Sequence, residues 1–256
     1  MLILVISIFM IAALALLLYM WRLAFLDQVL EHELRFEDFP KSFGKLTIFF
    51  ISDIHRRIVS GHILQQVSNR ADIVVIGGDL AEKNVPFERV EDNIRKLSGL
   101  APVYFVWGNN DYEMDYHLLD ATLLKYGVKI LDNTAVLFES DEGDKISLLG
   151  IDYVDGERDR LDLALKDAEE DSFKILVSHT PAVLGQVEPE HDIRLLLSGH
   201  THGGQIRLFG YGRYQKGRIA SRGSLTYLVS NGYGTSLVPL RLEAKPETHL
   251  MTIQPK

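Results

Sequence analysis

The fold is decided by one stretch, LTIFFISDIH at residues 46–55. Its apolar run from Leu46 to Ser52 predicts a buried strand, and Asp53 and His55 follow at the carboxyl end. Because these two residues are two apart on an extended segment, their side chains point to the same side and can grip one metal ion. The stretch therefore predicts a strand that delivers metal ligands to the edge of a sheet.

Four further apolar runs end in the same way. They are Ile73–Ile76, Val103–Trp107, Phe173–Ser178 and Arg194–Ser198, and the polar residues after them are Asp79, Asn109, His179, His200 and His202. Taken singly, such a residue is more typical of a turn or a helix cap than of a metal site. Parallel strands end at one edge of an α/β sheet, however, so the repetition predicts a shared site.

The chemistry of these side chains narrows the choice of metal ion. Carboxylate, amide and imidazole ligands suit first-row ions such as Mn, Fe, Co or Zn, and they suit Mg or Ca poorly. The chain contains no cysteine, which excludes thiolate ligands and disulfides. We expect two divalent ions, Mn, Fe or Zn with Mn favoured, about 3.5–4 Å apart and able to clamp a phosphoryl group.

The order of the motifs resembles the calcineurin-like metallophosphoesterase superfamily. Its pattern Asp-x-His, Gly-Asp, Gly-Asn-His-Asp/Glu, a lone His and Gly-His-x-His is matched in order from Asp53 to His202. The resemblance implies an α/β/β/α sandwich of two mixed sheets. It also implies that Asp53, His55 and His202 bind one metal, that Asn109, His179 and His200 bind the other, and that Asp79 bridges them. Residues 199–207 and 228–234 resemble the membrane-associated bacterial phosphodiesterase-type subgroup.

One position departs from that pattern. Asn110 stands where the family has a catalytic histidine, and Asp111 follows it. An amide donates a hydrogen bond but no proton, whereas a general acid contributes about 10²–10⁴ in rate. Three outcomes stay open: substrates with good leaving groups, an acid borrowed from His62 or His117, or a metal-binding pseudoenzyme that binds a phosphorylated ligand. We favour an enzyme, because all seven metal positions are kept.

The first 21 residues predict a membrane anchor. Met1 to Trp21 contains no charged side chain, which matches the length of a transmembrane helix, and Tyr19 and Trp21 suit the interface. A cleaved signal peptide is the alternative, but no Lys or Arg precedes the apolar run. We expect a single-pass anchor at 1–21, a juxtamembrane segment at 22–45 and a metallophosphoesterase domain at 46–256. The positive-inside count places that domain in the cytoplasm.

The remaining helices and strands are predicted from the spacing of apolar residues and from the Gly and Pro residues that end each segment. Helices are expected around 63–67, 87–97, 118–126 and 161–170, and strands at 135–138, 146–151, 205–209, 225–230 and 248–253. The 256 residues, 46% hydrophobic, allow one sizeable catalytic domain. The net charge of −8 argues against nucleic acid as the main partner.

Arginines give the remaining substrate predictions. Arg56 and Arg57 directly follow the first ligand pair and are candidates to bind phosphate oxygens, although both also fit solvated loop charges. A second basic stretch, Arg207 to Arg222, could frame an anionic head group. A phosphodiester is the favoured substrate and a membrane tether favours a lipid-linked one, while a soluble nucleotide diester and a non-enzymatic interaction protein remain alternatives.

Overall fold

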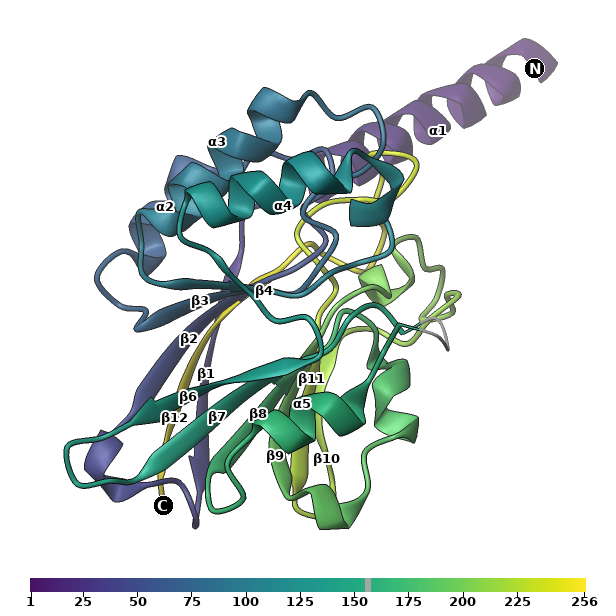
Figure 1. Cartoon of the computed structure of the whole chain (residues 1–256). Coiled ribbons are helices and arrows are strands. Elements are labelled where there is room, and N and C mark those ends of the chain that lie inside the picture. The colour runs from purple at the N-terminus through teal and green to yellow at the C-terminus, as the bar shows by residue number, and fades with distance from the viewer. Residues whose placement is uncertain (155–157) are drawn as a thin grey trace.

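The computed structural model describes residues 1–154 and 158–256, and it confirms the α/β/β/α sandwich (Figure 1). The first sheet has the strand order β1-β12-β2-β3-β4-β5 and the second β10-β11-β9-β8-β7-β6. Both sheets are mixed: β12 is antiparallel to β2 in the first, and β6 is antiparallel to β7 in the second. The bounds of the strands are β1 Val29–Phe36, β2 Leu46–Ile51, β3 Ile73–Ile76, β4 Val103–Phe105, β5 Lys129–Ile130, β6 Thr134–Glu139, β7 Lys145–Gly150, β8 Phe173–Val177, β9 Ile193–Ser198, β10 Arg218–Arg222, β11 Leu225–Val229 and β12 Thr248–Pro255.

Alternation along the central strands builds the layers. Phe49 and Ile51 of β2 pack under the helices, while Ile48 and Phe50 face the second sheet. In the described structure three helices cover the first sheet, and one covers the second (Figure 1). They are α2 Gly61–Val67, α3 Phe87–Ser98 and α4 Tyr116–Lys125 on the first sheet and α5 Leu161–Asp167 on the second. β2 and β3 are therefore buried on both faces, which explains their almost continuous apolar sequence.

The folded unit begins upstream of the boundary expected at Leu46. Residues of the expected juxtamembrane segment form β1, which pairs with β12 in parallel from Val29 opposite Thr248 to Phe36 opposite Pro255. The sequence concealed this strand because it lies at the sheet edge, where three of its eight side chains, all charged, are exposed. A fragment starting at Leu46 would leave β12 as an unprotected edge.

The N-terminal helix α1 covers Leu2–Ala24 and projects from the sandwich (Figure 1). By length and apolarity it is a candidate membrane span, a test that a signal sequence also passes. Its last two turns contact the domain: Met20, Leu23 and Ala24 are buried, and the Arg241 amide donates to the Met20 carbonyl at 3.1 Å. The helix and the loop before β12 are thus joined at one point.

One expected strand is absent from the described structure. Residues 205–209 make only isolated bridges, from Ile206 to Leu242 and Glu243 and from Leu208 to Tyr211. Positive φ angles at Gln205 and Phe209 break the extended conformation that a ladder needs. The prediction of a strand at Gln205–Phe209 was therefore wrong, and the segment is a loop beside the site described next.

Candidate metal centre

The expected ligands meet at the carboxyl ends of the strands that carry them, where the two sheets come together. Six of them form two groups, Asp53 with His55 and His202, and Asp79 with His179 and His200, and within each group the ligand atoms lie within 4.8 Å of one another. Asn109 lines the same cavity as Asp79 and His200. The structure thus brings together all seven residues that the sequence singled out.

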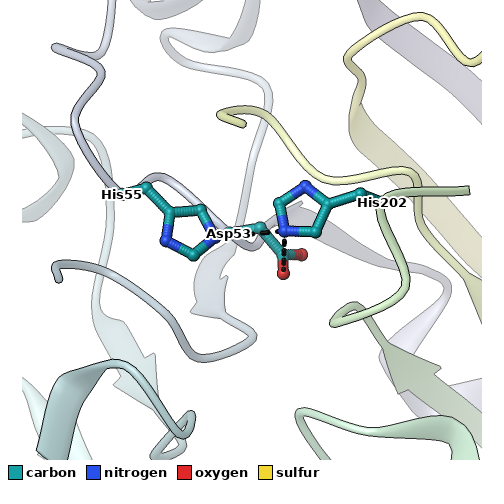
Figure 2. Close-up of side chains that lie close together, drawn as sticks. All are labelled: Asp53, His55 and His202. Carbon is teal, nitrogen blue, oxygen red and sulfur yellow. Dashed lines mark hydrogen bonds and ion pairs between the residues drawn. The ribbon is translucent and has the colours of Figure 1, made fainter. Parts of the chain in front are cut away.

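In the first group, two imidazoles face each other across a carboxylate. His55 Nε2 lies 3.1 Å from His202 Nε2, and His202 Nε2 lies 3.4 Å from Asp53 Oδ1 (Figure 2). The far nitrogen of His55, Nδ1, lies 3.1 Å from Glu82 Oε2. A carboxylate behind a ligand histidine fixes its tautomer and orientation, so Glu82 is a supporting residue that sequence reasoning missed.

The second group is joined to the first by Asp79. Its Oδ2 lies 3.3 Å from His179 Nε2 and 3.7 Å from His55 Nε2. His200 Nδ1 lies 3.1 Å from His179 Nε2, and His179 Nδ1 lies 2.9 Å from the Gly77 carbonyl, to which it donates when protonated. That bond leaves Nε2 of His179 as the ligand atom. One carboxylate oxygen therefore lies between two sets of imidazole nitrogens.

The backbone at this centre is strained. Five of the expected ligands, Asp53, His55, Asp79, His200 and His202, have φ between 49° and 70°. Such conformations cost on the order of 1–3 kcal/mol each and cluster at functional sites. The sequence does not reveal these positive φ angles. Because five of them occur at expected ligands, we infer that the loops are shaped to point the ligand side chains at the site, at some cost in stability.

Glycines at the strand ends admit these loops. Gly78 has φ +82°, and a Cβ there would lie 2.6 Å from His179 Nδ1. A Cβ at Gly199 would lie 2.4 Å from Asp53 Oδ2. Both positions therefore require a residue without a side chain, because the backbone passes directly beside a ligand.

Burial and mutual charge shift the titration of the ligands. Burial opposes protonation of His179, but the Asp79 and Asp53 carboxylates outweigh it and raise the pKa of His179 to about 10. Burial, with the neighbouring His55 and Arg241, holds the pKa of His202 well below its usual range. A compact set of buried acids and bases of this kind is typical of a functional site.

Two observations test whether these residues fit metal ions. The buried Asn109 Oδ1 has no hydrogen-bond partner, although buried carbonyl oxygens are nearly always satisfied. The donor set is also chemically consistent, because imidazole nitrogens and carboxylate or amide oxygens together suit Mn, Fe or Zn. Both observations fit a pair of divalent ions.

Asp111 holds the backbone of the ligand loops in place. Its carboxylate accepts from the amides of Asp79 at 2.8 Å, Gly108 at 2.9 Å and Ala81 at 3.0 Å. Burial and the nearby Asp79 raise the pKa of Asp111 to about 7. Asp111 thus fixes the loops that carry Asp79 and Asn109, without lining the cavity itself.

The cavity over the centre has a volume of about 370 Å³. Its lining includes Asn110, Arg213, Tyr214 and Leu237 besides the ligands. Two hydrogen bonds hold Asn110 in place. Its backbone N–H donates to Asp79 Oδ1 at 2.8 Å, and its side-chain oxygen accepts from Asn109 Nδ2 at 2.9 Å. The residue at the position of the family's histidine therefore faces the space where a substrate would bind.

The arginines after the first ligand pair lie elsewhere. Arg57 is buried, stacks on the Tyr233 ring with its guanidinium carbon 3.7 Å from the ring centroid, and donates to Asp27 and to the carbonyls of Leu26 and Tyr233. Arg56 pairs with Glu82. Neither is among the residues that line the cavity, whereas Arg213 is, so the contact of Arg56 and Arg57 with substrate stays a prediction. Arg57 instead ties the segment after α1 to the domain.

The proton donors suggested by sequence position are also distant. His62 on α2 and His117 on α4 are exposed, and neither lines the cavity. Sequence reasoning also missed Arg241, which is fully buried next to His202. Its side chain donates to the His202 carbonyl and to carbonyls of the loop at 231–234. Only a structure reveals it, because nothing in the local sequence distinguishes Arg241 from a surface arginine.

Comparisons with known proteins agree with this geometry. Residues 46–204 match the family model for calcineurin-like phosphoesterases. The chain is 45% identical to YpbG of Bacillus subtilis (strain 168), covering 87% of this chain and 88% of that protein. It is 25% identical to phosphodiesterase YaeI of Escherichia coli (strain K12), covering 88% of each chain. It is 29% identical to a Bos taurus transmembrane protein with metallophosphoesterase domain, over 84% of this chain and 54% of the relative. With more than half of its length matched and its ligands assembled at the strand ends, the chain belongs to the calcineurin-like phosphoesterase family.

Proposed function

We propose that this protein is a membrane-anchored phosphoesterase that depends on two divalent metal ions and hydrolyses phosphodiesters. The observation that carries the proposal is the position of Asp79 Oδ2, 3.3 Å from His179 Nε2 in one ligand group and 3.7 Å from His55 Nε2 in the other. A carboxylate placed between two ligand groups could be shared by the two ions of a dinuclear centre. Asp53, His55 and His202 would hold one ion, and Asn109, His179 and His200 the other.

The metal pair, when bound, supplies Lewis acidity and lowers the pKa of water. The chain's own residues bind and orient the substrate. The Arg213 guanidinium at the cavity can bind phosphate oxygens in bidentate fashion. The Asn110 amide can donate a hydrogen bond to the leaving oxygen, but it delivers no proton. We therefore propose that the natural substrate has a leaving group that departs without general-acid help.

The membrane anchor is part of the proposal. It is supported by the length and apolarity of α1 and by the transmembrane relative from Bos taurus. We propose a single span with the catalytic domain on the cytoplasmic side, following the basic residues Arg22, Arg35 and Lys41 after the helix. An anchored enzyme meets lipid-linked phosphodiesters at raised local concentration.

A second candidate is a metal-binding pseudoenzyme that binds a phosphorylated ligand. It is favoured by one observation, the presence of Asn110 where the family has its catalytic histidine. Such a protein would be stabilised by phosphate compounds in the presence of metal and would turn none of them over.

The test uses the full chain in detergent with Mn, Fe(II) or Zn. Bis-p-nitrophenyl phosphate and p-nitrophenyl phosphate are offered as diester and monoester. Asp79→Asn removes one charge from the shared ligand, and Asp171→Asn, at an exposed carboxylate, is the matched control. We expect metal-dependent diester hydrolysis that Asp79→Asn abolishes and Asp171→Asn retains. An inert parent that is active only as Asn110→His would establish the pseudoenzyme.

A further inference from the structure

Two loops beside the metal cavity expose an apolar surface, which we call the rim. The rim consists of residues 205–214 and 236–243. Its most exposed side chains are Phe209 at 85%, Tyr211 at 82% and Leu237 at 87%. Ile206, Leu208 and Val238 are also exposed. An exposed apolar patch at the mouth of a site is typical of an interaction surface.

The rim is one rigid unit. The Gln205 side chain donates to the Ser236 carbonyl at 3.0 Å and accepts from the Ser236 amide at 2.8 Å. The Arg207 amide donates to the Leu242 carbonyl, and the Leu242 amide donates to the Gln205 carbonyl. Arg207 also closes the first loop by donating to the carbonyls of Gly203, Gly210 and Tyr214. The two loops therefore present their apolar side chains together.

The rim lies where α1 leaves the domain. The Arg241 amide donates to the Met20 carbonyl at 3.1 Å, which fixes the second loop to the last turns of the helix. In Figure 1 the yellow loop after β11 lies beside the domain end of α1. Tyr19 and Trp21, which suit a membrane interface, are half-exposed and flank Met20 in the sequence. If α1 spans a bilayer, the rim meets that bilayer's surface.

Two of the exposed apolar residues of the rim have strained backbones, which indicates that their side chains have a function. Phe209 has φ 51° and Leu237 φ 63°, which is unfavourable for bulky residues. Phe209 and Gly210 form a two-residue turn closed by reciprocal bonds between the backbones of Leu208 and Tyr211. Such turns favour Asn-Gly. A phenylalanine at this tip is therefore worse for folding than the residue a turn ordinarily uses.

Charge identifies the partner. Residues 205–243 contain five arginines, one lysine and one acidic residue in a chain whose net charge is −8. Arg241 is fully buried and cannot reach a lipid, and the acidic residue, Glu243, accepts from the Gly210 amide at 2.8 Å. Arg213, Lys216 and Arg218 are exposed in this segment. Apolar side chains beside exposed basic ones match an anionic lipid surface, which attracts cations close to the membrane.

We infer that the rim is a membrane-contacting surface that inserts Phe209 and Leu237 into the interface of an anionic bilayer. The inference rests on the anchoring by α1 proposed above. Leu237 and Arg213 line the cavity as well as the rim side, so the cavity opens at the lipid surface. A phosphate carried by a membrane lipid would enter it without leaving the bilayer.

The chain's lack of cysteine allows single-site labelling of the full protein. We would attach an NBD fluorophore to Phe209→Cys and Leu237→Cys, and to two controls. Leu14→Cys reports the inserted helix, and Leu137→Cys is an exposed position on β6, away from α1. Each protein is reconstituted in phosphatidylcholine vesicles with and without phosphatidylglycerol, and quenching by doxyl-labelled lipid is measured.

We expect a blue shift and loss of emission with doxyl lipid at Phe209→Cys and Leu237→Cys, stronger with phosphatidylglycerol, and neither at Leu137→Cys. Quenching at Leu14→Cys alone would overturn the inference and leave the anchor intact, whereas no quenching at Leu14→Cys would refute the anchor as well. Protection at both rim sites that depends on protein concentration, without lipid quenching, would show a second copy there and also overturn it.

A second variant separates membrane contact from folding. Phe209→Asn and Leu237→Asn together place the residue best suited to positive φ at both sites. We expect the thermal midpoint to be retained or raised, and an NBD label at Tyr211→Cys to lose its lipid quenching in this background. Unchanged quenching at Tyr211→Cys would contradict a role for these two side chains.

Discussion

Replacement of Arg241 by methionine tests whether this buried guanidinium holds the site loops together. The Arg241 side chain donates to the carbonyls of Asn231 at 2.6 Å, Gly232 at 3.1 Å and Gly234 at 2.6 Å. It also donates to the carbonyls of Ala244 at 3.0 Å and His202 at 3.3 Å. Burial lowers the pKa of Arg241 to about 10, so the group still carries its charge at neutral pH. Methionine has a similar length and supplies no donor.

The expected loss is large. Each buried acceptor left without a donor costs about 1–3 kcal/mol, but the costs do not add fully because the loops relax. Five carbonyls lose a charged donor, and we expect a loss of unfolding free energy of about 3–5 kcal/mol. Arg241→Lys keeps the charge with a single point of donation, so its loss should be intermediate.

The assay is urea unfolding of the full chain in detergent, followed by the fluorescence of the buried Trp107. Arg218→Met, at an exposed position on β10, is the control and should change stability by less than about 0.5 kcal/mol. We also expect Arg241→Met to bind metal about 10–100-fold more weakly, because Arg241 supports His202. A loss equal to that of Arg218→Met would refute the assigned role.

Three further predictions follow from the site and the core. Asn110→His should speed hydrolysis of alkyl phosphodiesters on the order of tenfold or more, and aryl diesters less, because only poor leaving groups need a proton; equal gains in a steady-state assay would contradict this. Gly78→Ala should reduce bound metal measured by elemental analysis, since its Cβ would lie 2.6 Å from His179 Nδ1, whereas Gly143→Ala, also at positive φ but in open space, should not. Burial lowers the pKa of His249 to about 3. Because the unfolded imidazole titrates near pH 6.5, stability should be full above that pH and fall by about 1–2 kcal/mol by pH 5.5. His249→Gln should lessen the loss of stability between pH 7 and 5.5 by about this amount in urea titrations, although His202, whose pKa is also lowered, leaves part of the slope in place. An unchanged slope would contradict the contribution of His249.

The central elements could be predicted because their signals are local. β2, β3, β8 and β9 lie within one residue of their expected positions, since strands buried on both faces read as continuous apolar runs. The ligands follow these strands directly, so the sequence order also indicated which side chains would meet.

What escaped prediction depends on contacts between distant segments. β1 reads as a mixed, charged stretch, and its partner β12 lies more than two hundred residues away along the chain. Arg241 looks like any surface arginine until the loop at 231–234 folds around it. Arg57 was a candidate for phosphate contact or for a solvated loop charge, whereas in the structure it stacks on Tyr233 and pairs with Asp27, which fixes the segment after α1.

The most direct test of the account is the metal content of the purified full chain, measured by plasma mass spectrometry beside Asp79→Asn. The account predicts about two divalent ions per chain, with loss of at least one in Asp79→Asn because a single oxygen of Asp79 lies between both ligand groups. One ion or fewer per chain, unchanged by Asp79→Asn, would contradict the shared dinuclear centre.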